Sequence, residues 1–215
     1  MSAFSMRRGD RVMSAEKALQ VIERGYSCRL ATVEADGAPY CTPFLYVGMN
    51  GHLYVHSTSA RGHFRTNVDR EPRICLQLDE QDGVFDYGRF ECDSGLAFRS
   101  VVVFGTIKVV NERALKQAFC EALLRKYGKP GRDRPKNFFP RLDLIAVFEI
   151  AVERLTGKET AMPPMSEQWP AKDRTKTPEA APAAGTLATM PSVAISSAAV
   201  DVALAGPGFS PTSSI

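Results

Sequence analysis

The sequence predicts an α+β fold in which a mostly antiparallel β-barrel carries peripheral helices. Three observations predict it: short strands joined by tight turns, a long β-branched run with a glycine in its middle, and three separate helical segments. The chain has 215 residues, enough for one domain with a sizeable core but not for two full domains.

The first strands are expected in the segment CRLATVEADGAPYCTPFLYVGMNGHLYVHST, residues 28–58. It reads as three strands separated by two tight turns. The pairs Asp36-Gly37 and Asn50-Gly51 supply residues that adopt the positive φ that tight hairpins require. Successive hairpins of this kind favour an antiparallel sheet over a parallel one.

Later strands are expected at RICLQLD (73–79), AFRSVVVFGTIKVV (97–110) and LIAVFEIAVERLTG (144–157). The middle run is long and rich in β-branched residues, which favour strands. Gly105 interrupts it and predicts a bend or bulge of the kind that a barrel wall needs.

Three helices are expected around these strands. Ser14 is a candidate cap for a helix that ends before Gly25. A second helix is expected over residues 60–68, with Ser59 as its cap. A third, over residues 111–127, carries its apolar side chains on one face.

Composition excludes several classes of function. The net charge of +3 is too small to indicate a nucleic acid or a membrane surface as partner. The sequence has no signal peptide and no run of about 18 apolar residues that could form a membrane helix. The five cysteines are widely spaced and form no C-x-x-C pair, so neither a disulfide framework nor a zinc site is expected, and we expect reduced thiols in a cytoplasmic protein.

The C-terminal part of the sequence differs from the rest. After Glu179 the one charged residue is Asp201, and small uncharged residues dominate. We therefore expect a folded domain over residues 1–175 and a flexible tail over residues 178–215. A weak helix or strand at residues 192–205 is the alternative.

The segment HSTSARGHFR, residues 56–65, is the clearest candidate binding site. A strand is expected to end at His56, and Arg61, His63 and Arg65 are expected in the first turn of the helix that follows. Free N–H groups at a helix start attract anions, and Gly62 allows a bulky group to approach the backbone. The pattern predicts a phosphate site; a solvated basic surface is the alternative.

Two neighbouring strands suit a flat ligand. Residues 29–33 and 42–45 contain small residues and a proline, which leave backbone polar groups free to face a ligand edge. A plain core strand with a tolerated edge proline is the alternative.

The order of these motifs, RLATV, DG-PY-TPF, LYVHS, ARGH-R, EPRICLQLD and RSVVVFGTI, resembles the pyridoxamine 5′-phosphate oxidase-like, FMN-binding split-barrel family. It is closest to the branch that includes nitroimidazole-resistance-type proteins, and the match covers about residues 7–155. The resemblance implies a split β-barrel and a homodimer that holds two FMN molecules at the subunit interface.

The resemblance also implies site residues on four parts of the chain. The first strand would line the flavin, the second would contact its isoalloxazine ring, the third and the following helix would hold the ribityl phosphate, and a later strand would reach the flavin across the dimer. In that order the positions are Leu30, Ala31 and Thr32; Thr42, Pro43, Phe44 and Leu45; His56, Ser57, Arg61, Gly62 and His63; and Arg99 and Ser100. His56 is also a candidate catalytic proton donor, because an imidazole titrates near neutral pH.

The sequence departs from the family pattern in two places, and the second departure counts against vitamin B6 oxidation as the function. His63 stands where many relatives carry a lysine, and the chain lacks a counterpart of the substrate-phosphate-binding C-terminus of true pyridoxamine-phosphate oxidases. The leading hypothesis is an FMN-dependent oxidoreductase that acts on an unidentified small molecule. The alternatives are a haem-binding protein with His56 or His63 as axial ligand, a non-catalytic flavin-binding protein, and a deazaflavin-binding protein.

Overall fold

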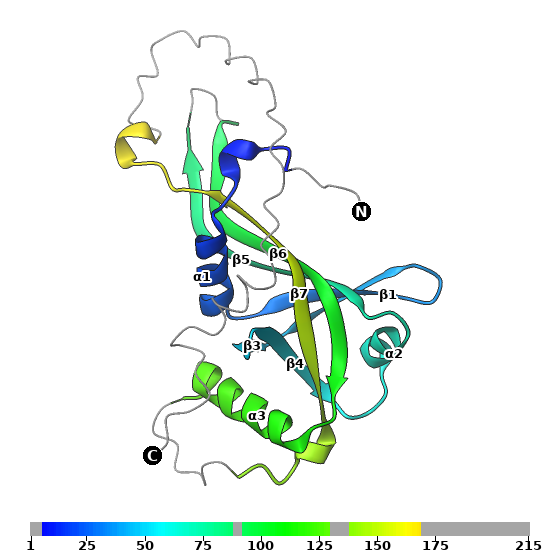
Figure 1. Cartoon of the computed structure of the whole chain (residues 1–215). Helices are drawn as coiled ribbons and strands as arrows, with labels where there is room; N and C mark the ends of the chain where they lie inside the picture. The colour runs from blue at the N-terminus through cyan, green and yellow to red at the C-terminus, as the bar shows by residue number, and fades with distance from the viewer. Residues whose placement is uncertain (1–5, 88–91, 130–137, 169–215) are drawn as a thin grey trace.

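A computed structural model describes residues 6–87, 92–129 and 138–168, and Figure 1 shows its arrangement. Seven strands form one antiparallel sheet in the order β2-β1-β5-β6-β7-β4-β3. The strands are β1 (Cys28–Val33), β2 (Pro39–Phe44), β3 (Tyr46–Met49), β4 (His52–Thr58), β5 (Arg73–Asp86), β6 (Ser94–Val110) and β7 (Ile145–Thr160). The helices are α1 (Ala15–Arg24), α2 (His63–Arg70) and α3 (Arg113–Tyr127), with 3-10 turns η1 (Gly9–Arg11), η2 (Leu142–Leu144) and η3 (Met165–Glu167). The predicted α+β fold is confirmed, and the predicted tail at 178–215 lies outside the described residues.

The second predicted strand is in fact two strands that lie at opposite edges of the sheet. β2 ends at Phe44, β3 begins at Tyr46, and Leu45 lies between them. β2 pairs with β1 and β3 pairs with β4, and among the described residues no ladder joins β2 to β3. The sheet is therefore strongly curved but not closed, as in a split barrel. Pro39 and Pro43 both lie on the edge strand β2, where a missing N–H interrupts no second ladder.

Both predicted tight turns are confirmed. Asn50 has φ 53° and Gly51 has φ 75°, which joins β3 to β4 through a two-residue hairpin turn. Gly37 has φ 90° in the β1–β2 turn, where the Asp36 carboxylate accepts a hydrogen bond from the Ala38 N–H at 3.0 Å.

The predicted irregularity at Gly105 is a β-bulge. Phe104 pairs with Arg154 and Gly105 with Val152, so β7 has one residue more than β6 at this point. A Cβ atom at Gly105 would lie 2.0 Å from the Ala151 carbonyl oxygen. Only glycine allows the two backbones to approach this closely, which explains the bend in the sheet.

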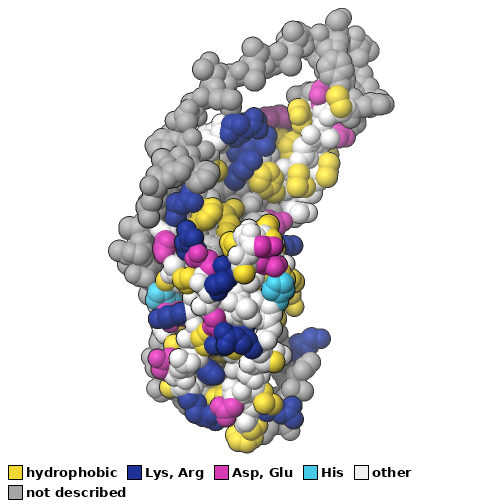
Figure 2. Space-filling model, turned by 90° about the vertical axis from the view of Figure 1, so that its right-hand side faces the viewer, with side chains coloured by type: hydrophobic (Ala, Val, Ile, Leu, Met, Phe, Trp, Pro, Cys, Tyr) yellow, Lys and Arg dark blue, Asp and Glu magenta, His cyan; other side chains and the backbone are white. Residues whose placement is uncertain are grey.

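β5 and β6 extend further than predicted and project as an arm beyond α1 (Figure 1). Side chains on the arm and on the segment beside it include exposed apolar groups: Val84 is 71% exposed and Met165 is 76% exposed. Figure 2 shows hydrophobic side chains gathered over this projecting end. The sequence expectation stopped at residue 79 because the charged continuation of β5 lacks the apolar alternation of a half-buried strand.

The helices cover two hydrophobic cores. The Ser14 hydroxyl accepts a hydrogen bond from the Lys17 N–H at 3.3 Å, which confirms the predicted cap of α1. α1 packs Val21 into the larger core, and α3 packs Phe119 into the smaller one. None of the helices in the described parts of the chain is long and apolar enough to span a membrane.

Candidate cofactor site at the start of helix α2

Helix α2 begins later than predicted, at His63, with Gly62 as its cap residue. The Gly62 carbonyl accepts hydrogen bonds from the N–H and the hydroxyl of Thr66, at 3.0 and 3.1 Å. The Ser59 N–H instead donates to the Leu144 carbonyl, which fixes Ser59 to the segment before β7. Ser59 as the cap and Arg61 in the first turn were therefore wrong: Arg61 precedes the helix.

The two arginines at this helix start share one acid, Asp69. Arg61 Nη2 lies 2.7 Å from Asp69 Oδ2, and Arg65 Nε lies 2.8 Å from Asp69 Oδ1. One carboxylate is therefore shared by two guanidinium groups, and a second, Glu34, lies beside His63. The Arg61 side chain is 69% exposed, and a Cβ at Gly62 would meet no atom within 4 Å, so the helix start is open to a ligand.

His63 joins the start of α2 to the β1–β2 hairpin. Its Nε2 lies 3.2 Å from Glu34 Oε1, and its ring stacks on Tyr40 with centroids 4.5 Å apart. These contacts fix the imidazole beside the edge strand β2. Sequence reasoning did not find Glu34 or Tyr40. Nothing in the local sequence indicates that the β1–β2 hairpin contacts the start of α2, which lies more than twenty residues after Tyr40.

Of the positions expected to line a flat ligand on β1, two lie in the core. Leu30 is 0% exposed and Thr32 is 1% exposed, and the Thr32 hydroxyl accepts a hydrogen bond from Asn67 Nδ2 at 3.2 Å. The intervening Ala31 is half-buried and points to the opposite face. Of the three predicted β1 positions, Ala31 is therefore the one whose side chain could contact a ligand outside the core.

The β2 positions divide between two faces. Thr42 lies opposite Leu30 in the ladder and shares its face, as does Phe44, whose ring lies 4.8 Å from Phe64 of α2. Pro43 is exposed on the other face, and Leu45 lies in the bend that leads to β3. The structure therefore brings Thr42 and Phe44 together with α2.

The two β4 positions also point in opposite directions. Ser57 lies on the same face of β4 as Val55, which points into the core on which α2 packs. His56 lies on the opposite face, and its ring centroid is 5.4 Å from that of Phe119 in α3. His56 Nδ1 is buried and has no hydrogen-bond partner among the described residues. Burial lowers the pKa of His56, which favours the neutral imidazole. Within one chain, His56 is not brought to the start of α2.

Arg99 and Ser100 lie on β6, at the base of the arm. Arg99 forms ion pairs with Glu80 at 3.1 Å and with Asp82 at 2.7 Å, and Arg24 binds the same Glu80 carboxylate. These contacts stabilise the junction of α1 with the arm. A flavin contact from Arg99 and Ser100 across a dimer remains a prediction.

Asp69 and Asn67 are further site residues that sequence reasoning missed. Asp69 had a usable signal, because Arg65 and Asp69 are four residues apart on one helix and such pairs meet. Asn67 had none, since its buried bond to Thr32 depends on how α2 lies across β1.

An open, curved antiparallel sheet with a basic helix start beside its edge strand defines a split-barrel protein with a candidate anion site. The family model for pyridoxamine 5′-phosphate oxidase matches residues 14–159. The chain belongs to the pyridoxamine 5′-phosphate oxidase family. No curated protein matches its sequence.

Solved structures with the same fold include proteins named for different cofactors. An FAD-binding protein from Mesorhizobium loti is 25% identical, with a TM-score of 0.51 over 70% of this chain and 98% of that one. The FAD and heme binding protein from Mycobacterium smegmatis is 19% identical, with a TM-score of 0.60 over 80% and 90% of the two chains. A 5-nitroimidazole antibiotic resistance protein from Bacteroides thetaiotaomicron is 18% identical, with a TM-score of 0.58 over 69% and 85%.

Proposed function

We propose that the chain binds FMN with its phosphate at the start of α2 and acts as an FMN-dependent oxidoreductase on a small molecule. The observation that carries the proposal is the open, basic helix start formed by Arg61, Gly62 and His63. Cations at a helix N-terminus oppose the helix dipole, so their placement there is favourable mainly when an anion is bound.

The residues present fit a phosphate. Among the described residues no side chain caps α2, so its first-turn N–H groups are available to an anion. Arg61 can offer two parallel N–H donors, although it must share its guanidinium with Asp69. Gly62 removes the steric obstacle of a side chain at the point where the backbone would meet the ligand.

We propose that the ring portion of a flavin lies beside the adjacent edge strand β2. Thr42 and Phe44 of β2 lie on the face that α2 covers, and the Tyr40–His63 stack closes the gap between strand and helix. A bound flavin would supply the hydride or electron transfer. The chain's own residues would fix the phosphate, orient the ring and keep water from one side of it.

We also propose that the protein is a homodimer. On the face of the sheet away from the core, Ala31 lies beside Cys41 of β2 and Cys75 of β5, and Phe104 of β6 lies beside Cys75. Cys41 is exposed and the other three are half-buried, and the Arg154 guanidinium lies 3.9 Å from the centroid of the Phe104 ring, so a second copy could cover a small, mainly apolar surface here. The five free thiols support a reducing, cytoplasmic compartment.

Haem binding is the second candidate, and a specific observation favours it. Burial favours the neutral form of His56, and its buried Nδ1 has no partner in the described part of the chain, so this nitrogen has a lone pair or a proton that no described group uses. His63 is less available because its Nε2 contacts Glu34. A haem at His56 would have to displace α3, whose Phe119 lies against the ring.

Identification of the bound cofactor tests these alternatives. We expect the purified protein to carry the visible bands of an oxidised flavin and to release FMN by mass. Release of FAD or a deazaflavin, or a Soret band from haem, would contradict the proposal. Bound FMN that no nicotinamide donor or chemical reductant can reduce would contradict the oxidoreductase part alone and leave a flavin-binding protein.

A further inference from the structure

A groove lies between α3 and the edge strand β3, away from α2. The groove has a volume of about 270 Å³ and is lined by the end of α1, by β3 and the turn after it, and by α3. No residue of α2 or β2 lines it, so it is distinct from the proposed cofactor site. Sites for nucleotide-sized ligands are generally larger, which suits this groove to a small molecule.

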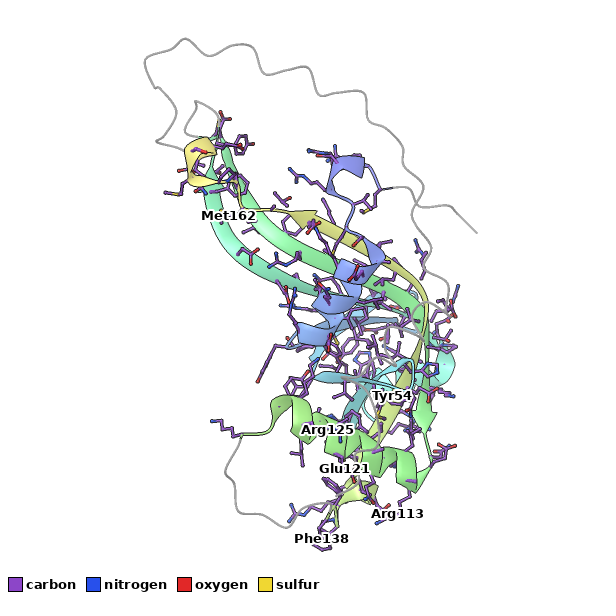
Figure 3. All side chains as sticks on the ribbon, turned by 60° about the vertical axis from the view of Figure 1, so that its left-hand side comes forward. Tyr54, Arg113, Glu121, Arg125, Phe138 and Met162 are labelled. Atoms are coloured by element: carbon purple, nitrogen blue, oxygen red, sulfur yellow. The ribbon has the colours of Figure 1, made fainter. Side chains whose placement is uncertain are left out.

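Four charged side chains line this groove: Glu23, Glu121, Arg125 and Lys126. None of them forms an ion pair with a described residue of the chain. Glu121 and Arg125, labelled in Figure 3, are four residues apart on α3 in the orientation that favours pairing, yet Glu121 instead accepts a hydrogen bond from Gln117 Nε2 at 3.0 Å. The groove therefore offers two charges of each sign to a ligand.

Lys126 lines the groove and has no carboxylate partner within the described residues. Its Nζ lies 3.8 Å from the ring centroid of Tyr46 and 5.5 Å from that of Tyr127. Burial lowers the pKa of Lys126 to about 8, and the charges of Cys28 and Glu23 raise it by a smaller amount. A ligand carboxylate beside Nζ would raise this pKa again by stabilising the charged amine.

The backbone of Gly48 adds a donor and an acceptor. The Tyr46 N–H donates to Tyr127 Oη at 3.2 Å, and the Tyr46 carbonyl accepts from it at 2.8 Å, so the polar groups of Tyr46 point away from β4. Because backbone direction alternates along an edge strand, the N–H and C=O of Gly48 point the same way, and Gly48 lines the groove. It has no side chain to cover them.

We propose that this groove binds a small zwitterion of the α-amino acid type with a short aliphatic side chain. The carboxylate would be held by the Gly48 N–H, Lys126 and Arg125. The ammonium would be held by the Gly48 carbonyl and by Glu23 or Glu121. Apolar groups in the groove wall, among them those of Met49, Ala118 and Ala122, would receive the aliphatic part.

Titration with L-valine and its two fragments tests the proposal. Isovalerate keeps the carboxylate and isobutylamine keeps the amine. Followed by ¹H–¹⁵N NMR, L-valine should give a saturable shift of the Gly48 amide, and each fragment should bind about tenfold or more weakly. Equal binding of isovalerate would overturn the zwitterion in favour of a plain anion site, and the absence of any saturable shift would overturn the site.

Matched variants separate a role in the ligand site from a role in folding. Lys126→Met should weaken L-valine about tenfold or more, whereas Lys116→Met should not, because the Lys116 amine donates to the Ile145 carbonyl outside the groove lining. If Lys126→Met does not fold, Arg125→Gln replaces an exposed side chain and should give a similar loss. Unchanged L-valine affinity in a folded Lys126 or Arg125 variant would contradict the proposal. FMN content should be the same in all these variants as in the wild type, because the groove is separate from the proposed cofactor site.

Discussion

Tyr40 and His63 stack with ring centroids 4.5 Å apart and thereby join the edge strand β2 to the start of α2. Glu34 fixes the same imidazole from the β1–β2 turn. This arrangement gives the proposed FMN site a strand wall and a basic helix start that cannot move independently.

His63→Ala should weaken FMN binding about two- to tenfold, because an imidazole contributes one ordinary hydrogen bond to a phosphate. Titration of the apoprotein measures it. Tyr40→Leu removes the stack and keeps the imidazole, so it should cost less. An equal loss in both variants would show that the stack, rather than a phosphate contact, determines affinity.

Gly105→Ala should destabilise the protein by about 3 kcal/mol or more, because a Cβ there would lie 2.0 Å from the Ala151 carbonyl oxygen. Thermal unfolding should show a Tm decrease of several degrees. Gly62→Ala is the matched control: its Cβ meets no atom within 4 Å, and we expect a change within about 0.5 kcal/mol. A tolerated Gly105→Ala would contradict the close approach of Gly105 to the Ala151 carbonyl.

Glu149 should make stability fall in acid. Burial raises the pKa of this carboxyl, but the hydrogen bonds from Lys108 at 2.7 Å and Tyr54 at 2.9 Å together lower it. A lowered folded-state pKa contributes stability above the unfolded pKa of about 4.3, and that contribution is lost as the pH falls through the folded value. Urea unfolding at several pH values should show that Glu149→Gln costs stability at neutral pH and that the cost shrinks below about pH 4.

The control for this prediction is Glu153→Gln, an exposed position on the same strand. Its unfolding curves should follow the wild-type pH dependence. A cost of Glu149→Gln that stays constant from neutral to acid pH would mean that the carboxylate is not the group that titrates.

Cys41→Arg should separate the proposed homodimer into monomers, because it places a charge on the exposed edge-strand end of the proposed dimer surface, beside Ala31. Light scattering measures the change. Gln20→Arg, on the exposed side of α1, should leave the assembly intact. A wild-type monomer with bound flavin, or a Cys41→Arg dimer, would rule out this interface.

The sequence predicted the elements that local signals specify. The cap at Ser14, the positive φ of Asn50 and Gly51 and the bulge at Gly105 each follow from one or two residues and are all present. The division at Leu45 was not predictable, because the run from β2 to β3 is continuous in β propensity and only the global pairing sends its halves to opposite edges.

The same limit applies to the candidate site. The basic motif with Arg61 was readable, but its acid partner Asp69 and the orientation of His56 toward α3 depend on which face of each element packs. Successive side chains along a strand point to opposite faces of the sheet. A family motif therefore predicts which strand carries His56 but not the face to which its ring points.

The most direct measurement is the affinity of Arg61→Ala for FMN and for riboflavin, which lacks the phosphate, with Arg113→Ala as control. Arg113 is an exposed arginine on α3 whose partner is Asp143, at 3.2 Å. Loss of the Arg61 contact to a dianion should cost about 2–3 kcal/mol, or roughly 30- to 150-fold in FMN affinity, with riboflavin unchanged and the Arg113 variant like wild type. Equal weakening of both flavins, or unchanged FMN affinity, would contradict a phosphate site at the start of α2.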